Sequence, residues 1–274
     1  MPTRRAAISL LLSALFASLP LHAAAAPSCT PLEAIPAAVA DAPFLVFGEV
    51  HGTREVPAFV AAYLCAAAKQ QRGITLAIEL PSTAQDALDA FMASEGTPQD
   101  VERLLSSGPW RSPRQDGRTS IDTLRLIQQA RTLRAEGADI RIAAIDPVAA
   151  TLQRSTAMAE RLRAELRQAK GRQVLTLVGG PHAIRSKGNR FNPNYESAVY
   201  LLADQRPLSL TVGTAGGTAW VCRGATPDTC GAIAWDINRV DPAPAGPFSL
   251  VPPSPQFDGV FYVGATTASP PAAQ

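Results

Sequence analysis

Beyond its first 26 residues, the sequence lacks any apolar run approaching the roughly eighteen residues that a membrane-spanning helix needs. Residues 1–26 themselves have the pattern of a secretory signal peptide, with Arg4 and Arg5 ahead of an apolar stretch that ends in small residues. A lipoprotein box is also missing, because residues 26–28 before Cys29 do not match the Leu-x-small-Cys pattern. We therefore expect a soluble mature protein, periplasmic or secreted, with no membrane span after signal cleavage.

An excess of charge of either sign is lacking as well. Because residues 1–26 hold two arginines and no acidic residue, the 25 basic side chains of the full chain fall to 23, which equals the number of acidic ones. Aromatic residues make up only 6% of the chain, so neither a basic tract nor an aromatic surface marks a nucleic-acid or membrane partner. We expect a small-molecule or peptide substrate as partner, and no nucleic acid.

No internal linker divides the chain, and about 250 residues are enough to bury one core. We expect a single α/β domain over residues 27–266 and a disordered tail over residues 267–274. The Cys-x-x-Cys spacing of thiolate metal sites is absent. In an exported chain, four cysteines favour two disulfides. Cys222 and Cys230 flank a turn-like loop, which leaves Cys29 to pair with Cys65.

What the sequence does contain is a regular alternation of short apolar runs and segments with helical period, which predicts a mainly parallel central sheet flanked by helices. The expected leading strands are 44–47, 74–80, 140–145 and 174–178. Helices are expected after the first strand, from the Ser82-x-x-Gln85 capping-box signature, from Ile121 with Ser120 as its cap, over 148–170, and over 193–203. The runs 208–212, 218–222 and 260–263 are joined by turns and predict an antiparallel C-terminal part.

All four leading strands end in ionisable residues. The first ends in Gly48-Glu49-Val50-His51, the second in Glu79, the third in Asp146, and the fourth in Gly179-Gly180-Pro181-His182. Because ligands of open α/β sheets bind outside the carboxyl ends of the strands, we expect these side chains in one site. A structural alternative stays open for each: either histidine as a hydrogen-bonded structural residue, Glu79 as a helix cap, and Asp146 as a turn residue before Pro147.

Other polar residues near these strand ends are candidates for binding substrate. Arg54 and Glu55 open the helix after the first strand, where free backbone amides favour an anionic group. Asp116-Gly117-Arg118 lies in a weakly structured loop that would fold over the site. Arg185 follows the second histidine motif. The three tryptophans, Trp110, Trp220 and Trp235, are interpreted as packing residues.

The motifs Gly48-Glu49-Val50-His51-Gly52, with Glu55, and Gly180-Pro181-His182-Ala183 resemble the superfamily that joins erythromycin esterase-like hydrolases, ChaN-type haem-binding proteins and Tiki/TraB-type metalloproteases. The resemblance spans residues 44–202. It implies a shared α/β fold with a site built from Glu49, His51, Glu79, Asp146 and His182. The Gly-Glu-x-His spacing is closer to the ChaN and Tiki pattern than to erythromycin esterases, which place one more residue between the two. The missing lipobox departs from ChaN, and Glu49 departs from Tiki.

The leading functional hypothesis is a hydrolase of ester or amide bonds with two alternative mechanisms. In the first, His51 and His182 with Glu49, Glu79 or Asp146 hold a divalent ion such as Zn or Mn that activates water, Glu49 accepts the proton, and Arg118 or Arg185 stabilises the oxyanion. In the second, His51 with Glu49 activates water directly. The rival hypothesis is a haem- or ligand-binding envelope protein with His51, His182 or Tyr195 as ligands. A third is a catalytically degenerate scaffold.

Overall fold

The computed structural model describes residues 29–147, 153–236 and 238–273. The expected signal peptide lies outside the described residues, as do residues 148–152 of the predicted helix 148–170. The centre of the fold is a seven-stranded sheet with strand order β3-β2-β4-β1-β5-β9-β8. Its strands are β1 (Phe44–Glu49), β2 (Ile74–Pro81), β3 (Ile140–Asp146), β4 (Gln173–Gly179), β5 (Leu208–Gly213), β8 (Phe248–Ser249) and β9 (Gly259–Tyr262).

The sheet is parallel from β3 through to β9, and β8 alone pairs antiparallel, with β9. The hairpin of β6 (Thr218–Cys222) and β7 (Cys230–Ala234) forms a separate two-stranded antiparallel sheet. These pairings confirm the predicted fold class. They also correct one detail, because the runs 208–212 and 260–263 pair parallel to each other rather than belonging to the antiparallel part.

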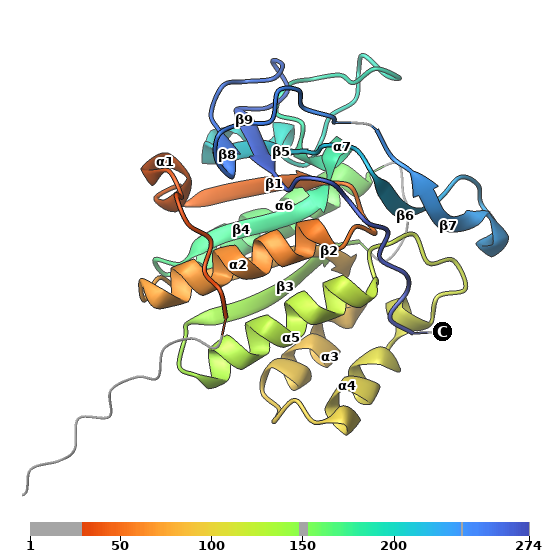
Figure 1. Ribbon diagram of the computed structural model, residues 1–274. Coiled ribbons are helices and arrows are strands. Elements are labelled where there is room, and N and C mark those ends of the chain that lie inside the picture. The colour runs from red at the N-terminus through yellow and green to blue at the C-terminus, as the bar shows by residue number, and fades with distance from the viewer. Residues whose placement is uncertain (1–28, 148–152, 237, 274) are drawn as a thin grey trace, which may run out of the picture.

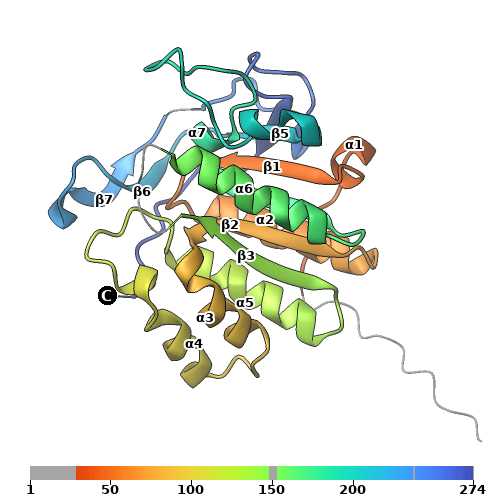
Figure 2. The same ribbon diagram turned by 180° about the vertical axis from the view of Figure 1, so that it is seen from behind.

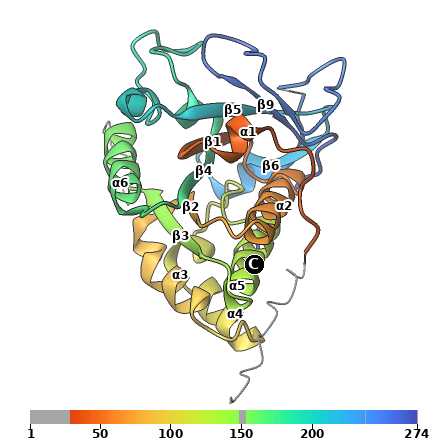
Figure 3. The same cartoon turned by 90° about the vertical axis from the view of Figure 1, so that its left-hand side faces the viewer.

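Helices cover both faces of the sheet (Figures 1 and 2). Seen along the layers, α6 lies on one side of the strands and α2 and α5 lie on the other (Figure 3). The helices are α1 (Ala37–Ala40), α2 (Glu55–Lys69), α3 (Gln85–Met92), α4 (Pro98–Leu105), α5 (Ile121–Ala135), α6 (Arg154–Gln168) and α7 (Gly180–Ala183), with 3₁₀ turns at Ser82–Ala84, Gly108–Arg111, Tyr200–Gln205 and Pro227–Thr229.

Burial on both faces explains why the leading strands are continuous apolar runs rather than alternating ones. Residues 44–48 of β1 and 74–80 of β2 are all buried. On one face, Phe47 packs edge-on against Phe59 and Tyr63 of α2, with ring centroids 5.9 Å apart in both pairs. The apolar side chains of α2 are buried, among them Val56, Val60 and Leu64. This packing fixes the positions at which the strands end.

The predicted cap of α5 is confirmed, since the Ser120 side chain accepts a hydrogen bond from the Thr123 backbone N–H. The capping box at Ser82 is wrong. A 3₁₀ turn occupies Ser82–Ala84, α3 begins only at Gln85, and no side chain caps it. The Gln85 amide instead donates to the Ile142 carbonyl, and its oxygen accepts from the Ala144 N–H. The Gln85 side chain thus bonds backbone groups of the edge strand β3 and is not available for the capping box.

The helix predicted over residues 193–203 is also wrong, because only a 3₁₀ turn forms at Tyr200–Gln205. The preceding segment is held by its asparagines. Asn189 Oδ1 accepts hydrogen bonds from the backbone N–H groups of Phe191 and Asn192, and Asn192 Oδ1 accepts one from Asn194. Side-chain bonds of this kind compete with helical backbone bonds, and sequence periodicity does not reveal the outcome.

The C-terminal segment expected to be disordered is packed along the molecule. The Ser269 side chain is fully buried and donates to Asp122 Oδ2. The carbonyl of Pro270 accepts from the Ile121 N–H, and the Ala272 N–H donates to the Thr119 carbonyl. The hydrogen bonds that order the C-terminal segment are made with residues 119–122, which are distant in the sequence. The local sequence of the C-terminal segment therefore could not predict them.

Both predicted disulfides are present. Cys29–Cys65 ties the chain ahead of β1 onto α2, and Cys222–Cys230 joins the last residue of β6 to the first residue of β7. Among the described residues, no helix is both long enough and apolar enough to cross a membrane.

Candidate active site

The strand order places β3, β2, β4 and β1 side by side, so their carboxyl ends share one edge of the sheet. In Figure 1 the tips of these strands lie on the same side of the molecule as the β6–β7 hairpin. The structure brings together most of the predicted site residues at this edge, and below we call them the strand-end cluster: Glu49, His51, Glu79, Asp116, Arg118, Asp146 and His182, joined by Arg154.

Glu79 is the centre of the strand-end cluster. Its side chain is 4% exposed, and its two oxygens contact different histidines: Oε2 lies 3.4 Å from His51 Nε2, and Oε1 lies 3.7 Å from His182 Nε2. The backbone N–H of Gly179 donates to Oε2 over 2.7 Å. The two imidazoles come from segments more than 100 residues apart in the sequence, His51 from the turn after β1 and His182 from α7, and they are neighbours across one carboxylate.

The two histidines differ in how firmly they are held. His51 Nδ1 lies 2.9 Å from Glu49 Oε1, so both ring nitrogens of His51 face carboxylates. His182 Nδ1 lies 3.4 Å from the Tyr195 hydroxyl, a longer contact with a neutral partner. The His51 side chain is 20% exposed and the His182 side chain 11%. Both rings thus reach the surface of the cluster.

Two arginines neutralise the acidic residues from the outer side. Arg154 Nη2 donates to Glu79 Oε1 over 2.6 Å, and its Nε donates to Asp146 Oδ1 over 2.7 Å. Arg118 Nη1 donates to Asp146 Oδ2 over 2.7 Å, while its Nε and Nη2 bind Asp116. Within the described part of the chain, Arg154 Nη1 makes no hydrogen bond or ion pair. That nitrogen is available to an anionic or carbonyl group of a ligand.

The surroundings drive the pKa values of the two histidines apart. Burial opposes a charge on His51, but the negative charges of Glu79 and Glu49 and hydrogen bonds to both outweigh it and raise the pKa of His51 to about 10. Burial is the largest influence on His182 and lowers its pKa below the ordinary value of 6.5; the charge of Glu79 opposes this shift, and the charges of Arg154 and His51 add to it. At pH 7 His51 is therefore an imidazolium and His182 a neutral imidazole.

The same contacts keep the acid between them ionised. Burial alone would raise the pKa of Glu79, but the charge of His51, its hydrogen bond to Glu79 and the charge of Arg154 hold the pKa of that carboxyl well below 4.5. The strand-end cluster thus combines a cation, an anion and a neutral base at neutral pH. Pairs of groups whose pKa values are driven apart in this way are typical of acid–base sites.

A glycine lies three residues before each histidine, Gly48 before His51 and Gly179 before His182, and neither marks a sharp turn. Neither Gly48 nor Gly179 has a positive φ. A Cβ at Gly179 would lie 2.9 Å from His51 Nε2 and 3.4 Å from Glu79 Oε2. Gly179 is therefore required because the His51 ring approaches the backbone of β4 closely, not because the chain turns there.

Three predicted residues lie outside the strand-end cluster. Glu55 Oε2 accepts a hydrogen bond from the Thr267 N–H, and Arg54, which is 54% exposed, pairs with Glu55 over 3.5 Å. Both residues thus contact the C-terminal segment. Arg185 pairs with Asp258, whose other carboxylate oxygen accepts from the Ser209 N–H. These contacts give the three residues structural roles.

Sequence reasoning missed Arg154. It opens α6, immediately after residues outside the described part, and nothing in its local sequence marks it. A signal was nevertheless present, since two strand-end acids buried side by side, Glu79 and Asp146, require cationic partners. Tyr195 was considered only as a haem ligand, although its hydroxyl faces His182.

The donor set does not fit a divalent metal ion. Among the described residues, no group of three His, Cys, Asp or Glu side chains is arranged to hold one. Two of the proposed metal ligands already have other partners. Asp146 accepts hydrogen bonds from two guanidinium groups, which would repel a divalent cation. Both ring nitrogens of His51 face carboxylates.

The fold is that of an α/β protein, and its architecture is similar to that of an erythromycin esterase. An erythromycin esterase mutant in its open conformation superposes with a TM-score of 0.62 at 10% sequence identity, covering 84% of this chain and 92% of that one. A succinoglycan biosynthesis protein gives a TM-score of 0.59 at 10% identity, covering 84% and 90%. A Bacillus cereus protein gives 0.51 at 9% identity, covering 83% and 90%.

These likenesses show a shared fold. No family model and no curated protein matches the sequence. The assignment to a Gly-Glu-x-His branch stays a prediction.

Proposed function

We propose that this protein is a periplasmic or secreted hydrolase of ester or amide bonds that works through the strand-end cluster without a metal ion. The observation that carries the proposal is the shared carboxylate of Glu79, with His51 at one oxygen and His182 at the other. The likeness of the fold to an erythromycin esterase supports the reaction class, and the two disulfides support an oxidising compartment.

The roles of the histidines follow from their charges and differ from the sequence-based hypothesis, in which His51 was the base. His182, neutral at pH 7, is the general base that removes a proton from the attacking water. His51, an imidazolium at pH 7, is the general acid that protonates the leaving alcohol or amine. Glu49 holds His51 Nδ1 at 2.9 Å, whereas Nε2 lies 3.4 Å from Glu79 and is loose enough to donate to a substrate.

The charge that develops on the carbonyl oxygen needs a donor that is already in place. Arg154 supplies one, because its Nε and Nη2 are fixed on Asp146 and Glu79 while Nη1 makes no bond within the described part of the chain. After the carbonyl–heteroatom bond breaks, His182 carries a proton and His51 lacks one. Glu79 contacts both rings and provides the path by which the proton returns.

The proposal is tested by assaying the purified mature protein, without a histidine tag, on a panel of esters and amides in EDTA. Hydrolysis should persist in the chelator, and His51→Gln should lower kcat by about a hundredfold or more on general-acid grounds. Hydrolysis that stops in EDTA and returns with Zn or Mn would instead support the metal mechanism.

A panel with no substrate hydrolysed, together with a Soret shift on titration with haem, would overturn the proposal in favour of a haem-binding protein. The matched control is Arg54→Gln, which changes an exposed charge outside the strand-end cluster. Arg54→Gln should hydrolyse the same substrates at the wild-type rate.

A further inference from the structure

Next to the strand-end cluster lies a hollow of about 390 Å³ that the mechanism above does not use. It is enclosed by the 3₁₀ turn at Gly108–Arg111 and the loop after it, by the β6–β7 hairpin, and by the C-terminal residues. Its walls include the rings of Trp220, Pro113, Pro227 and Pro271, whereas Trp110, which also lines it, is only 1% exposed. The volume lies in the range of small-ligand sites.

Both walls of the hollow are continuous with the strand-end cluster. On one wall, Gln115 is followed by Asp116, which holds Arg118 against Asp146. On the other wall, the backbone N–H of Trp220 donates a hydrogen bond over 2.8 Å to the carbonyl of Gly52, the residue after His51. A group bound in the hollow therefore lies next to the segments that carry the reacting side chains.

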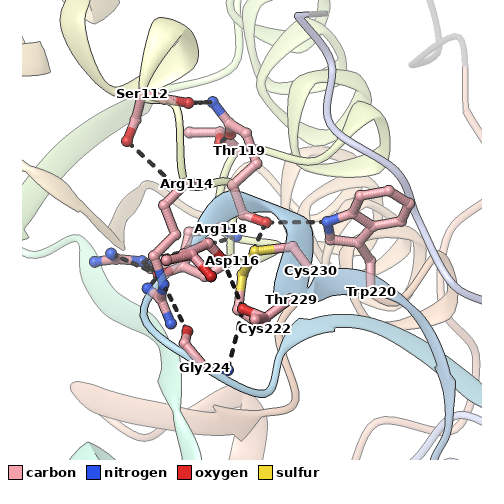
Figure 4. The surroundings of a disulfide bond; sticks show 12 residues. Ser112, Arg114, Asp116, Arg118, Thr119, Trp220, Cys222, Gly224, Thr229 and Cys230 are labelled. Carbon is pink, nitrogen blue, oxygen red and sulfur yellow. Dashed lines mark hydrogen bonds and ion pairs between the residues drawn. A yellow bond between two sulfur atoms is a disulfide. The ribbon is translucent and has the colours of Figure 1, made fainter.

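The hollow is preformed by contacts that hold its walls together. The Trp220 indole N–H donates to the Gln115 carbonyl over 3.0 Å, and Arg114 Nε donates to the Gly224 carbonyl over 3.2 Å. Figure 4 shows the Trp220 ring and the Cys222–Cys230 disulfide beside the segment that carries Arg114, Asp116 and Arg118. The disulfide closes the loop of the hairpin, where β6 ends and β7 begins. A ligand would thus find fixed ring faces rather than a loop that must first be ordered.

We propose that this hollow is the specificity subsite of the hydrolase, and that it takes an uncharged, ring-bearing apolar group on the acyl side of the substrate. This inference rests on the proposed function. Indole and pyrrolidine rings offer flat apolar faces suited to another ring. Arg111, the one charged side chain among the described lining residues, is exposed. A charged acyl group would therefore lose its hydration inside the hollow without gaining a buried partner.

Ala273 allows the subsite to be filled without disturbing the strand-end cluster, because it lines the hollow near the chain end. The matched control is Val251→Trp, which adds an indole at a residue that is 74% exposed and does not line the hollow. Proton release from ethyl 3-phenylpropionate and ethyl acetate is followed for both variants. Ala273→Trp should raise KM for the phenylpropionate at least tenfold and leave ethyl acetate within twofold, and Val251→Trp should leave both substrates unchanged.

A second measurement needs no turnover. Benzyl alcohol should give saturation-transfer NMR signals with the wild-type protein and with Val251→Trp, and these signals should be lost with Ala273→Trp. Binding of benzyl alcohol without hydrolysis of any ester would support the subsite while the hydrolase proposal fails. Hydrolysis with an unchanged substrate preference in Ala273→Trp, and benzyl alcohol signals that persist in that variant, would overturn the subsite and leave the hydrolase proposal standing.

Discussion

The central strands bury polar side chains at both of their ends, but the two groups differ in kind. At the amino end of β4, Gln173 is buried and its amide donates to the carbonyls of Val39, Ala40 and Ala42. Its oxygen accepts from the Tyr63 hydroxyl over 2.7 Å. Burial raises the pKa of Tyr63 to about 12, so this group stays neutral and fully bonded at any physiological pH.

At the carboxyl end of the same strands, the strand-end cluster mixes an imidazolium, a neutral imidazole and an ionised acid, Glu79, that accepts a hydrogen bond from the Arg154 guanidinium. The amino-end group satisfies backbone carbonyls and so stabilises the fold. The strand-end cluster leaves a neutral ring nitrogen and a guanidinium nitrogen that can act on something else. The comparison teaches that buried polar residues alone do not mark a functional site, whereas a mixture of protonation states does.

The largest expected effect is a difference in kcat between a substitution at the carboxyl end of the strands and one at their amino end. His182→Gln removes the neutral base and should lower kcat by a hundredfold to ten-thousandfold, the typical contribution of a general base. Gln173→Leu at the other end should lower the free energy of unfolding, because it removes three hydrogen bonds to backbone carbonyls, and leave kcat of the folded protein unchanged. Steady-state kinetics and urea unfolding of both variants check the contrast, and equal losses of kcat would refute it.

The pH dependence should give the next largest effect. Because the pKa of His182 is lowered below 6.5, activity should fall only when the pH drops through that lower value, by about tenfold per pH unit. Because the pKa of His51 is raised to about 10, activity should also fall as the pH rises above about 10. If His51 were the base, activity would instead increase up to pH 10. A kcat/KM profile from pH 4 to 11 distinguishes these outcomes.

A smaller effect is expected from placing a methyl group between β4 and His51. In Gly179→Ala the new Cβ would lie 2.9 Å from His51 Nε2 and displace the ring from Glu79. Misplacement by a fraction of an ångström should cost about tenfold in kcat. The neighbouring Gly180→Ala is the control, since its Cβ would meet its nearest contact, the Glu49 carbonyl, at an ordinary 3.7 Å. If Gly180→Ala lowers kcat as much as Gly179→Ala, the loss comes from the backbone and not from His51.

The sequence predicted more of the fold than of the chemistry of the candidate site. Strands buried on both faces appear as apolar runs, so β1 to β4 were placed to within about two residues, and the strand-end residues Glu49, Glu79, Asp146 and His182 followed from them. The capping box at Ser82 and the helix after Pro193 failed because side chains there bind backbone groups that a local pattern does not include.

The chemistry of the site was harder to predict, because it depends on contacts between distant segments. Arg154 binds acids that are 8 and 75 positions away in the chain. The charge of His51 depends on both Glu49 and Glu79, and only the first of these is near it in sequence. The residue types were therefore predictable from the sequence, whereas the difference in charge between His51 and His182, on which the proposed roles rest, was not.

The smallest expected effect on activity comes from making the same substitution, tyrosine to phenylalanine, at each end of the strands. Tyr63→Phe removes the donor to Gln173 and leaves a buried acceptor without it, which should lower the free energy of unfolding by about 1–3 kcal/mol with kcat unchanged. Tyr195→Phe removes a hydroxyl that is 3.4 Å from His182 Nδ1 and only partly buried. It should cost less stability but lower kcat a few-fold and shift the acid limb of the pH profile, because Nδ1 loses the partner that orients the base. Urea unfolding and pH–rate profiles of the two variants provide the measurement. If both variants lose stability and neither shifts the acid limb, Tyr195 is a packing residue like Tyr63, and the boundary of the strand-end cluster lies at His182.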